Sequence, residues 1–159
     1  MGIVRDLYYA KKMSAGLQLP APSSAALIKR MYLAKHMGAK NLAGPLEKGT
    51  FQESKAAGTP YDDMKSANDY RLRSIDLIPI DAQKVTISLA DYTTYNFCAC
   101  LYDADGLYLG GQTFVGWKGQ DYTLNNASAY FIACVIKRLD GALMNDSDKA
   151  AVNLRVVAV

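Results

Sequence analysis

The sequence is poor in the residues that most often carry catalysis. Among its 159 residues there is one histidine, His36, and one tryptophan, Trp117. It contains no Gly-x-Ser-x-Gly elbow, no paired-histidine metal motif and no glycine-rich phosphate loop. Paired carboxylates, which glycosidases use, fall only in turn-like stretches, where acidic side chains usually bond their own backbone. These pairs are Asp62–Asp63, Asp103 with Asp105, and Asp146 with Asp148. We therefore expect a protein that is not an enzyme and binds no cofactor.

Long apolar runs are also missing. No stretch approaches the roughly 18 residues that a membrane span needs. The N-terminus carries Arg5, Asp6, Lys11 and Lys12, where a secretion signal would be apolar. Half of all residues are hydrophobic, which is enough for the core of one domain. We expect no membrane span and a protein that is made in the cytoplasm and left unprocessed.

Cysteines are few, and their number is odd. Cys98, Cys100 and Cys134 all lie in apolar runs, and an odd count without an export signal argues against a disulfide framework. Cys98 and Cys100 would share one strand face, but only the distant His36 could join them as a metal ligand. We expect reduced thiols packed in the core and no metal site.

A calcium loop is the second metal site to weigh. The stretch Asp103-Ala-Asp105-Gly106 resembles the start of such a loop, because alternate acidic side chains can converge on one cation. The later ligands of the loop, including the closing glutamate, are missing. We therefore expect this stretch to form a hairpin turn.

Positive charge is concentrated at the start of the chain. Residues 1–48 hold eight Lys and Arg against two acidic residues, whereas the other 111 residues hold ten against thirteen. Two similar stretches lie 24 positions apart in this basic part, RDLYYAKKMSA at 5–15 and KRMYLAKHMGA at 29–39. Their apolar residues recur at helical spacing, and a Pro- and Ser-rich linker separates them. The sequence predicts an arm over residues 1–40, made of two short helices with a 24-residue repeat.

The repeat indicates what the arm binds. Isolated helices of about a dozen residues are marginal in water and need a surface to lie on. A polyanion or an acidic membrane would accept any scatter of positive charge, whereas two units that repeat in register suit two equivalent pockets on a symmetric assembly. The side chains expected to dock there are Leu7, Tyr8, Met13, Met31, Tyr32 and Met37. The alternative is that both helices fold back on their own domain or pair with each other.

The remainder of the chain has the pattern of short strands. The predicted strands are one near Phe51, then the stretches 71–80, 85–89, 95–102, 107–117, 130–138 and 151–159. DADG and LDGALMNDSD are read as two hairpin connections. No helical pattern lies between the strands, so residues 41–159 are predicted to form an antiparallel β-sandwich of jelly-roll-like type.

The order of motifs in this domain resembles a β-sandwich module that recurs in bacteriophage tail, fibre and other virion proteins. That module has an Asn-aliphatic entry, an Arg-x-Arg strand running into Ile-Pro, a Tyr-Asp-x-x-Gly hairpin, a Gly-Trp and a strand ending in Arg-x-Asp-Gly. The corresponding stretches here are NLAGPLEKGTFQES, YRLRSIDLIPIDAQKVTISL, FCACLYDADGLYLGGQTFVGW and SAYFIACVIKRLDGALM. The resemblance covers residues 41–159, and the basic arm is not part of it.

The resemblance implies a structural protein of the virion, made in the host cytoplasm. Its expected partners are other virion proteins in a symmetric particle, with several copies or a homo-oligomer. Nucleic acid is not expected as a partner, because the repeat in the arm favours equivalent pockets over a polyanion. Such modules resemble carbohydrate-binding sandwiches, so the alternative function is adsorption to a host glycan. Aromatic rings can cover the flat faces of sugars, which makes Trp117 and Tyr122 the candidate contacts. Tyr92 and Tyr108 are also expected near exposed loops, and the competing interpretation of Trp117 is that it seals one end of the core.

Overall fold

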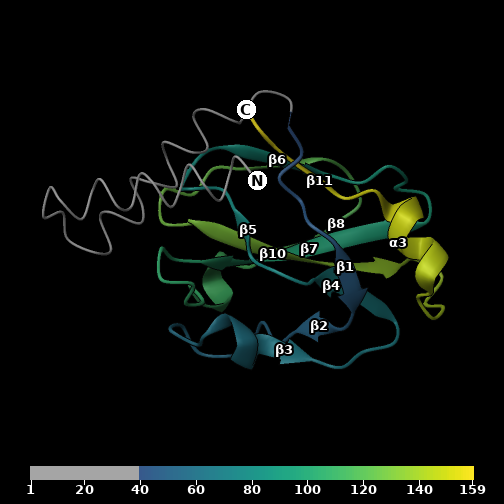
Figure 1. Cartoon of the computed structure of the whole chain (residues 1–159), viewed down its shortest axis with the longest axis horizontal. Coiled ribbons are helices and arrows are strands. Elements are labelled where there is room, and N and C mark those ends of the chain that lie inside the picture. Colours follow the sequence, from purple (N-terminus) through teal and green to yellow (C-terminus); the bar gives the residue numbers. More distant parts are fainter. Residues whose placement is uncertain (1–39) are drawn as a thin grey trace, which may run out of the picture.

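The computed structural model describes residues 40–159, which form a mainly β structure with antiparallel sheets (Figure 1). The larger sheet has six strands. Their order is β1 (Leu46–Lys48), β4 (Arg71–Ser74), β10 (Phe131–Arg138), β7 (Tyr95–Tyr102) and β8 (Val115–Lys118), and β5 (Ile78–Pro79) also pairs with β10. The prediction of a mainly β, antiparallel domain is confirmed for these residues.

Two smaller sheets lie on opposite faces of the larger one, so that the strands form three layers (Figure 1). One smaller sheet contains β11 (Arg155–Ala158), β6 (Val85–Ser88) and β9 (Tyr122–Leu124) in that order. The other contains β2 (Thr50–Phe51) and β3 (Lys65–Ser66), with the 3-10 turn η1 (Tyr61–Met64) between them. Each smaller sheet covers its own hydrophobic core, called here the β6 core and the β2 core after the strands that cover them.

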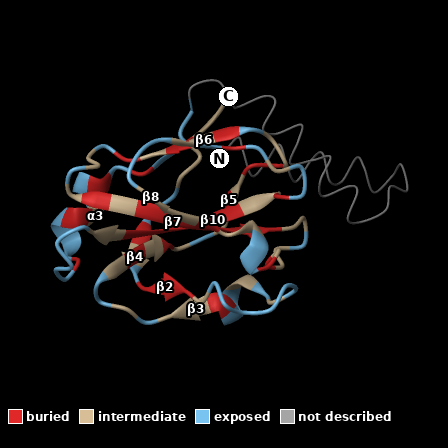
Figure 2. Ribbon diagram, turned by 180° about the vertical axis from the view of Figure 1, so that it is seen from behind, coloured by how far each residue is buried: buried red, intermediate tan, exposed pale blue. Residues whose placement is uncertain are grey.

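The two long central strands supply side chains to both cores. Along β7, Phe97, Ala99 and Leu101 enter the β6 core. The residues between them, Cys98 and Cys100, enter the β2 core. This alternation follows from the two-residue period of a strand, and it explains why the sequence NFCACLY is apolar on both faces. Figure 2 shows the resulting buried middle layer, coloured red along β7 and β10.

A buried serine fills the gap where the chain leaves β4 and rejoins the sheet at β5. Both strands pair with the same edge of β10, β4 through Val135–Lys137 and β5 through Phe131 and Ile132. Between them, the Ser74 hydroxyl accepts a hydrogen bond from the Cys134 amide at 2.9 Å. The side chain therefore supplies a bond that the strand backbone does not, and the buried amide stays satisfied.

Several local predictions need correction. The stretch predicted as a strand at 107–117 contains the 3-10 turn η2 (Gly111–Thr113), and β8 begins only at Val115. LDGALMNDSD is not a hairpin, because it leads into the helix α3 (Asp146–Val152). The last strand consequently begins at Arg155 and not at 151. The stretch 71–80, predicted as one strand, is divided into β4 and β5, and the strand pattern did not predict β1, β3 or β9.

The DADG stretch does form the predicted turn. The Asp103 carboxylate accepts hydrogen bonds from the Asp105 and Leu107 amides, both at 2.9 Å, and Gly106 adopts a positive φ of 78°. Isolated bridges then pair Tyr108 with Tyr102 and Leu107 with Pro60. Within residues 40–159, no helix is long and apolar enough to cross a membrane.

Candidate functional site: an aromatic and basic surface on the larger sheet

A β-bulge sets the direction of Trp117. Val115 of β8 pairs with Ala99 of β7, and Lys118 pairs with Phe97, so β8 contains one residue more than β7 over this interval. Without the extra residue, Trp117 would lie opposite Phe97 and on the β6 side of the sheet. The bulge turns it to the other face, where its half-buried indole packs against the β2 core.

Two cations lie over the Trp117 ring. The Lys137 ammonium is 4.3 Å from the ring centroid and the Arg71 guanidinium carbon is 5.2 Å away. Lys137 pairs with Arg71 on one side and with Asn96 on the other. Since β7 separates β10 from β8, the indole reaches Lys137 across β7, near Asn96. We call Arg71, Asn96, Trp117 and Lys137 the Trp117 surface.

Within residues 40–159, the positive charge of this surface has no acidic counterpart. Arg71 donates to the Thr50 hydroxyl at 3.1 Å, and neither Arg71 nor Lys137 forms an ion pair with any residue between 40 and 159. The neighbouring Arg73 differs, because its guanidinium contacts Glu47 at 2.8 Å. Two uncompensated cations beside one indole make the surface suitable for a negatively charged group.

Asn96 adds an unsatisfied acceptor. Its side-chain oxygen is buried and has no hydrogen-bond partner among the described residues, although Asn96 as a whole is half-buried. A buried polar atom left without a partner costs about 1–3 kcal/mol. The only other unsatisfied buried atom that the described part of the chain has on this side of the sheet is the Tyr102 hydroxyl, deep in the β2 core.

Tyr122 does not lie beside Trp117. It packs at the margin of the β6 core, on the opposite side of the larger sheet, with the Lys118 ammonium 4.8 Å from its ring centroid. The two aromatic residues singled out from the sequence therefore belong to different surfaces. The bulge is the reason, because without it Trp117 would lie on the β6 side of the sheet, where Tyr122 packs.

The other tyrosines expected near exposed loops are held by the fold. Tyr108 is only 1% exposed, and its hydroxyl donates to the Glu53 carbonyl at 2.9 Å. The expectation that Tyr108 is displayed near a loop is therefore wrong. The Tyr92 hydroxyl donates to Asp121 at 2.8 Å and accepts from the Leu89 amide at 2.9 Å. Burial raises the pKa of Tyr92 to about 12, so its proton stays in place at neutral pH.

Asp148 is not the turn acid that the sequence suggested. Its carboxylate is 2% exposed and accepts from the Tyr95 hydroxyl at 2.5 Å, the Arg138 guanidinium at 3.1 Å and the Asn145 amide at 2.8 Å. Burial opposes its ionised form, but these hydrogen bonds outweigh burial and hold the pKa of Asp148 below its usual value. The carboxylate joins α3 to β7 and β10, which is a structural role.

The cysteines behave as core residues. All three are buried free thiols, with Cys98 and Cys100 in the β2 core and Cys134 in the β6 core. Burial raises the pKa of Cys100 to about 12, and that of Cys134 likewise. Thiols that stay protonated are poor nucleophiles and poor metal ligands. No group of three or more His, Cys, Asp or Glu that could hold a metal ion occurs in the portion of the chain from Lys40 onward.

The described chain begins at a hydrogen-bonded clasp. The Asn41 side chain donates to the Leu154 carbonyl at 3.0 Å and accepts from the Val156 amide at 2.9 Å. The Leu42 amide donates to the Val156 carbonyl at 2.8 Å. Residues 41 and 42 therefore cover the outer edge of β11 and fix the point from which the preceding chain extends.

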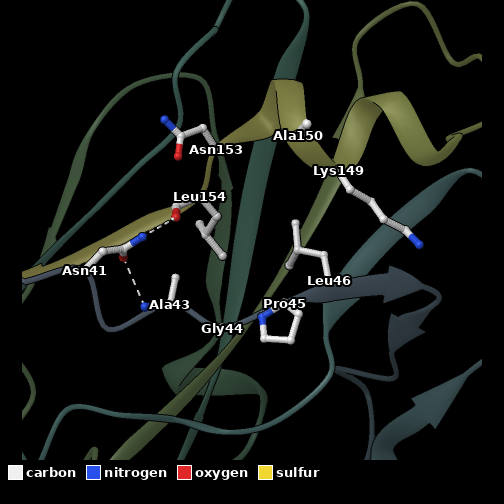
Figure 3. Close-up of a pocket in the computed structure, with 9 residues that line it drawn as sticks. All are labelled: Asn41, Ala43, Gly44, Pro45, Leu46, Lys149, Ala150, Asn153 and Leu154. Carbon is white, nitrogen blue, oxygen red and sulfur yellow. Dashed lines mark hydrogen bonds between the residues drawn. The ribbon is translucent and has the colours of Figure 1, made fainter.

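A pocket of about 360 Å³ lies beside this clasp (Figure 3). Its floor is apolar, because Leu46 and Leu154 point toward each other, while the Lys149 side chain extends away from it. The pocket is lined by Asn41, Ala43, Gly44, Pro45, Leu46, Lys149, Ala150, Asn153 and Leu154. Of the described residues that line it, only Lys149 is charged.

The predicted docking residues of the arm, Leu7, Tyr8, Met13, Met31, Tyr32 and Met37, lie outside the described residues. Comparison with known proteins gives no further guidance: no family model matches the chain, and neither a curated protein nor a solved structure matches it significantly.

Proposed function

We propose that this chain is a structural protein of a bacteriophage particle. Residues 1–40 attach it to a symmetric assembly of virion proteins, and residues 41–159 form a jelly-roll-like sandwich that is displayed or packed against neighbours. The clasp at Asn41 is the observation that carries this proposal. Because Asn41 and Leu42 are tied to β11 by hydrogen bonds, an arm held by a partner would place the sandwich at a fixed point.

The charge distribution and the repeat support attachment by the arm. Residues 1–48 carry a net charge of +6, whereas the rest of the chain carries −3. The two repeated units would each occupy one of two equivalent pockets, and the linker would raise the effective concentration of the second unit once the first is bound. Particle symmetry supplies equivalent pockets at regular spacing.

Deletion of residues 1–40 tests this proposal. The deletion keeps Asn41, so the clasp stays intact, and the remaining chain is expected to fold but to be missing from assembled particles. Asn41→Ala in the full chain is the matched control, because it weakens the clasp and keeps the arm; it should still enter particles. Normal incorporation of the deleted chain would show that the arm is not the anchor.

The repeat permits a sharper version of this test. Tyr8→Ala and Tyr32→Ala occupy equivalent places in the two units. If both units dock, each single variant should reduce incorporation and the double variant should reduce it far more, because linked sites depend on each other through effective concentration. A double variant that behaves like one of the singles would argue against two equivalent docking units.

A second candidate function is adsorption to a host glycan. It is favoured by the half-buried Trp117, which the bulge directs to the β2 side of the larger sheet, with Arg71 and Lys137 beside it. A glycan array probed with the wild-type protein and with Trp117→Ala tests this function. Binding by the wild type that the variant loses supports adsorption, and no binding by either protein leaves the structural role alone.

A further inference from the structure

The Trp117 surface differs from a simple sugar-stacking platform. In such a platform the aromatic ring offers a bare face to the ligand, whereas here the Lys137 ammonium and the Arg71 guanidinium both lie over the indole, at 4.3 and 5.2 Å from its centroid. An incoming ligand therefore meets N–H donors and positive charge together with the ring. The chemistry of this surface favours an anionic group over a neutral sugar face.

We propose that Arg71, Lys137 and Trp117 bind an acidic saccharide, one that carries a carboxylate or sulfate group. This inference rests on the second proposed function and specifies its ligand. The planar guanidinium of Arg71 can donate two parallel hydrogen bonds to the anionic group, and Lys137 adds a mobile point charge from the adjacent strand. The indole provides the apolar wall against which the ring of the sugar lies.

The remaining features of the surface fit a ligand with hydroxyl groups. The Asn96 side-chain oxygen lies in the same row and lacks a donor. When Lys137 turns from the indole toward the anion, a hydroxyl of the saccharide can reach Asn96 and donate to it. Neither cation has to leave an ion pair to bind the ligand, because neither forms one within residues 40–159.

A single-stranded nucleic acid fits this surface less well. Its bases bind by stacking on open aromatic faces, and its affinity depends on a groove of cations that follows the backbone. Here residues 40–159 bring one indole together with two cations, which is too few cations to follow a backbone. The surface matches one anionic group and one ring.

Trp117 provides a direct readout, because it is the only tryptophan of the chain. The full-length protein is titrated with oligogalacturonate, with a sulfated dextran, with neutral dextran and with oligo-dT, and indole emission is followed. The basic arm can attract any polyanion, but it contains no tryptophan. We expect a saturable change of emission with an acidic saccharide and none with neutral dextran.

Two charge-matched variants isolate the site. Lys137→Gln removes a cation of the Trp117 surface, whereas Lys84→Gln removes an exposed cation next to β6, on the other side of the molecule. Loss of one charge-assisted hydrogen bond should weaken binding about tenfold in Lys137→Gln, and Lys84→Gln should bind like the wild type. Thermal melting of both variants confirms that they are folded.

The outcomes separate this inference from the function on which it rests. Equal weakening by both variants, or a preference for oligo-dT, would overturn the acidic-saccharide site. Binding to neutral glycans that Lys137→Gln leaves unchanged would overturn it too, while adsorption to glycans would stand. If the protein bound no saccharide, on the array or in solution, both the acidic-saccharide site and the adsorption function would be wrong.

Discussion

At the scale of single residues, the buried charge of Asp148 contributes to folding and not to chemistry. It is bonded by Tyr95, Arg138 and the Asn145 amide, and Arg138 is held in turn by Asp140 at 2.8 Å. A hydrogen bond from Arg138 lowers the pKa of Asp140 to about 2. Because these acids are ionised in the folded state, their bonds are present at neutral pH and are lost in acid.

The first prediction concerns the pH dependence of stability. The folded pKa of Asp148 lies below its unfolded value, so its contribution is complete above about pH 5 and is lost as pH falls toward the folded pKa. Asp148→Asn should lower the free energy of unfolding by about 2 kcal/mol at pH 7. Urea unfolding at pH 7 and pH 3 should show a smaller acid loss for this variant than for the wild type.

The matched control removes an exposed carboxylate. Asp63→Asn changes a residue on the surface of η1 and should alter the free energy of unfolding by less than about 0.5 kcal/mol. If Asp148→Asn were as stable as this control at pH 7, the proposed role of the buried carboxylate would be wrong.

Backbone strain gives the second prediction. Asp81 and Ala82 follow β5 with φ values of 50° and 57°, a left-handed conformation that costs a residue with a side chain about 1–2 kcal/mol. Ala82→Gly should therefore raise the free energy of unfolding by about 1 kcal/mol. Ala127→Gly, at an exposed residue without positive φ, should do the opposite, and denaturant midpoints of both variants provide the check.

At the scale of elements, the sequence predicted the strands whose side chains alternate between two faces of a sheet. The strands β6, β7 and β10 were found because apolar residues recur with a period of two, or run continuously where both faces are buried. The helix α3 was missed because the Asp-Gly pair at Asp140 resembles a hairpin signal, and because a seven-residue helix is too short to show a periodic pattern. The start of α3 nevertheless has a sequence signal, because Asn145 is followed three residues later by Asp148, the spacing of a capping box.

The candidate site was predicted only in part, because its residues are far apart in the sequence. Trp117 could be chosen as the sole tryptophan, but the residues around it come from other strands: Arg71 is 46 positions before it, Asn96 is 21 before it and Lys137 is 20 after it. The face of the sheet on which Trp117 lies depends on an extra residue in β8, and no local sequence pattern predicts this bulge. Arg71 and Lys137 were therefore not singled out from the sequence.

The third prediction tests the cap of α3. The Asn145 side chain accepts from the Ser147 and Asp148 amides, at 2.9 and 3.2 Å, and Asp148 bonds the Asn145 amide in return. Asn145→Ala should destabilise the domain by about 1 kcal/mol. Asn125→Ala, an exposed loop substitution, is the control, and an equal effect of both on the melting temperature would show that the cap contributes nothing.

At the scale of the whole molecule, the three layers give residues 41–159 cores of their own. The described members of the β6 core and of the β2 core pack against one another within residues 40–159, and the clasp closes the edge of β11 at the first of these residues. The fourth prediction is that the chain without residues 1–40 unfolds cooperatively, with a free energy within about 1 kcal/mol of that of the full chain. Matching denaturant titrations of the two proteins measure this difference.

Hydrogen exchange tests the central claim most directly, because it follows both parts of the chain in one experiment. The full-length protein is labelled in isolation and in assembled particles, and amide exchange is compared by mass spectrometry. The account predicts that exchange over residues 1–40 slows on assembly, while β7 and β10 are equally protected in both states. Exchange over residues 1–40 that is already slow in isolation and unchanged in particles would contradict the account.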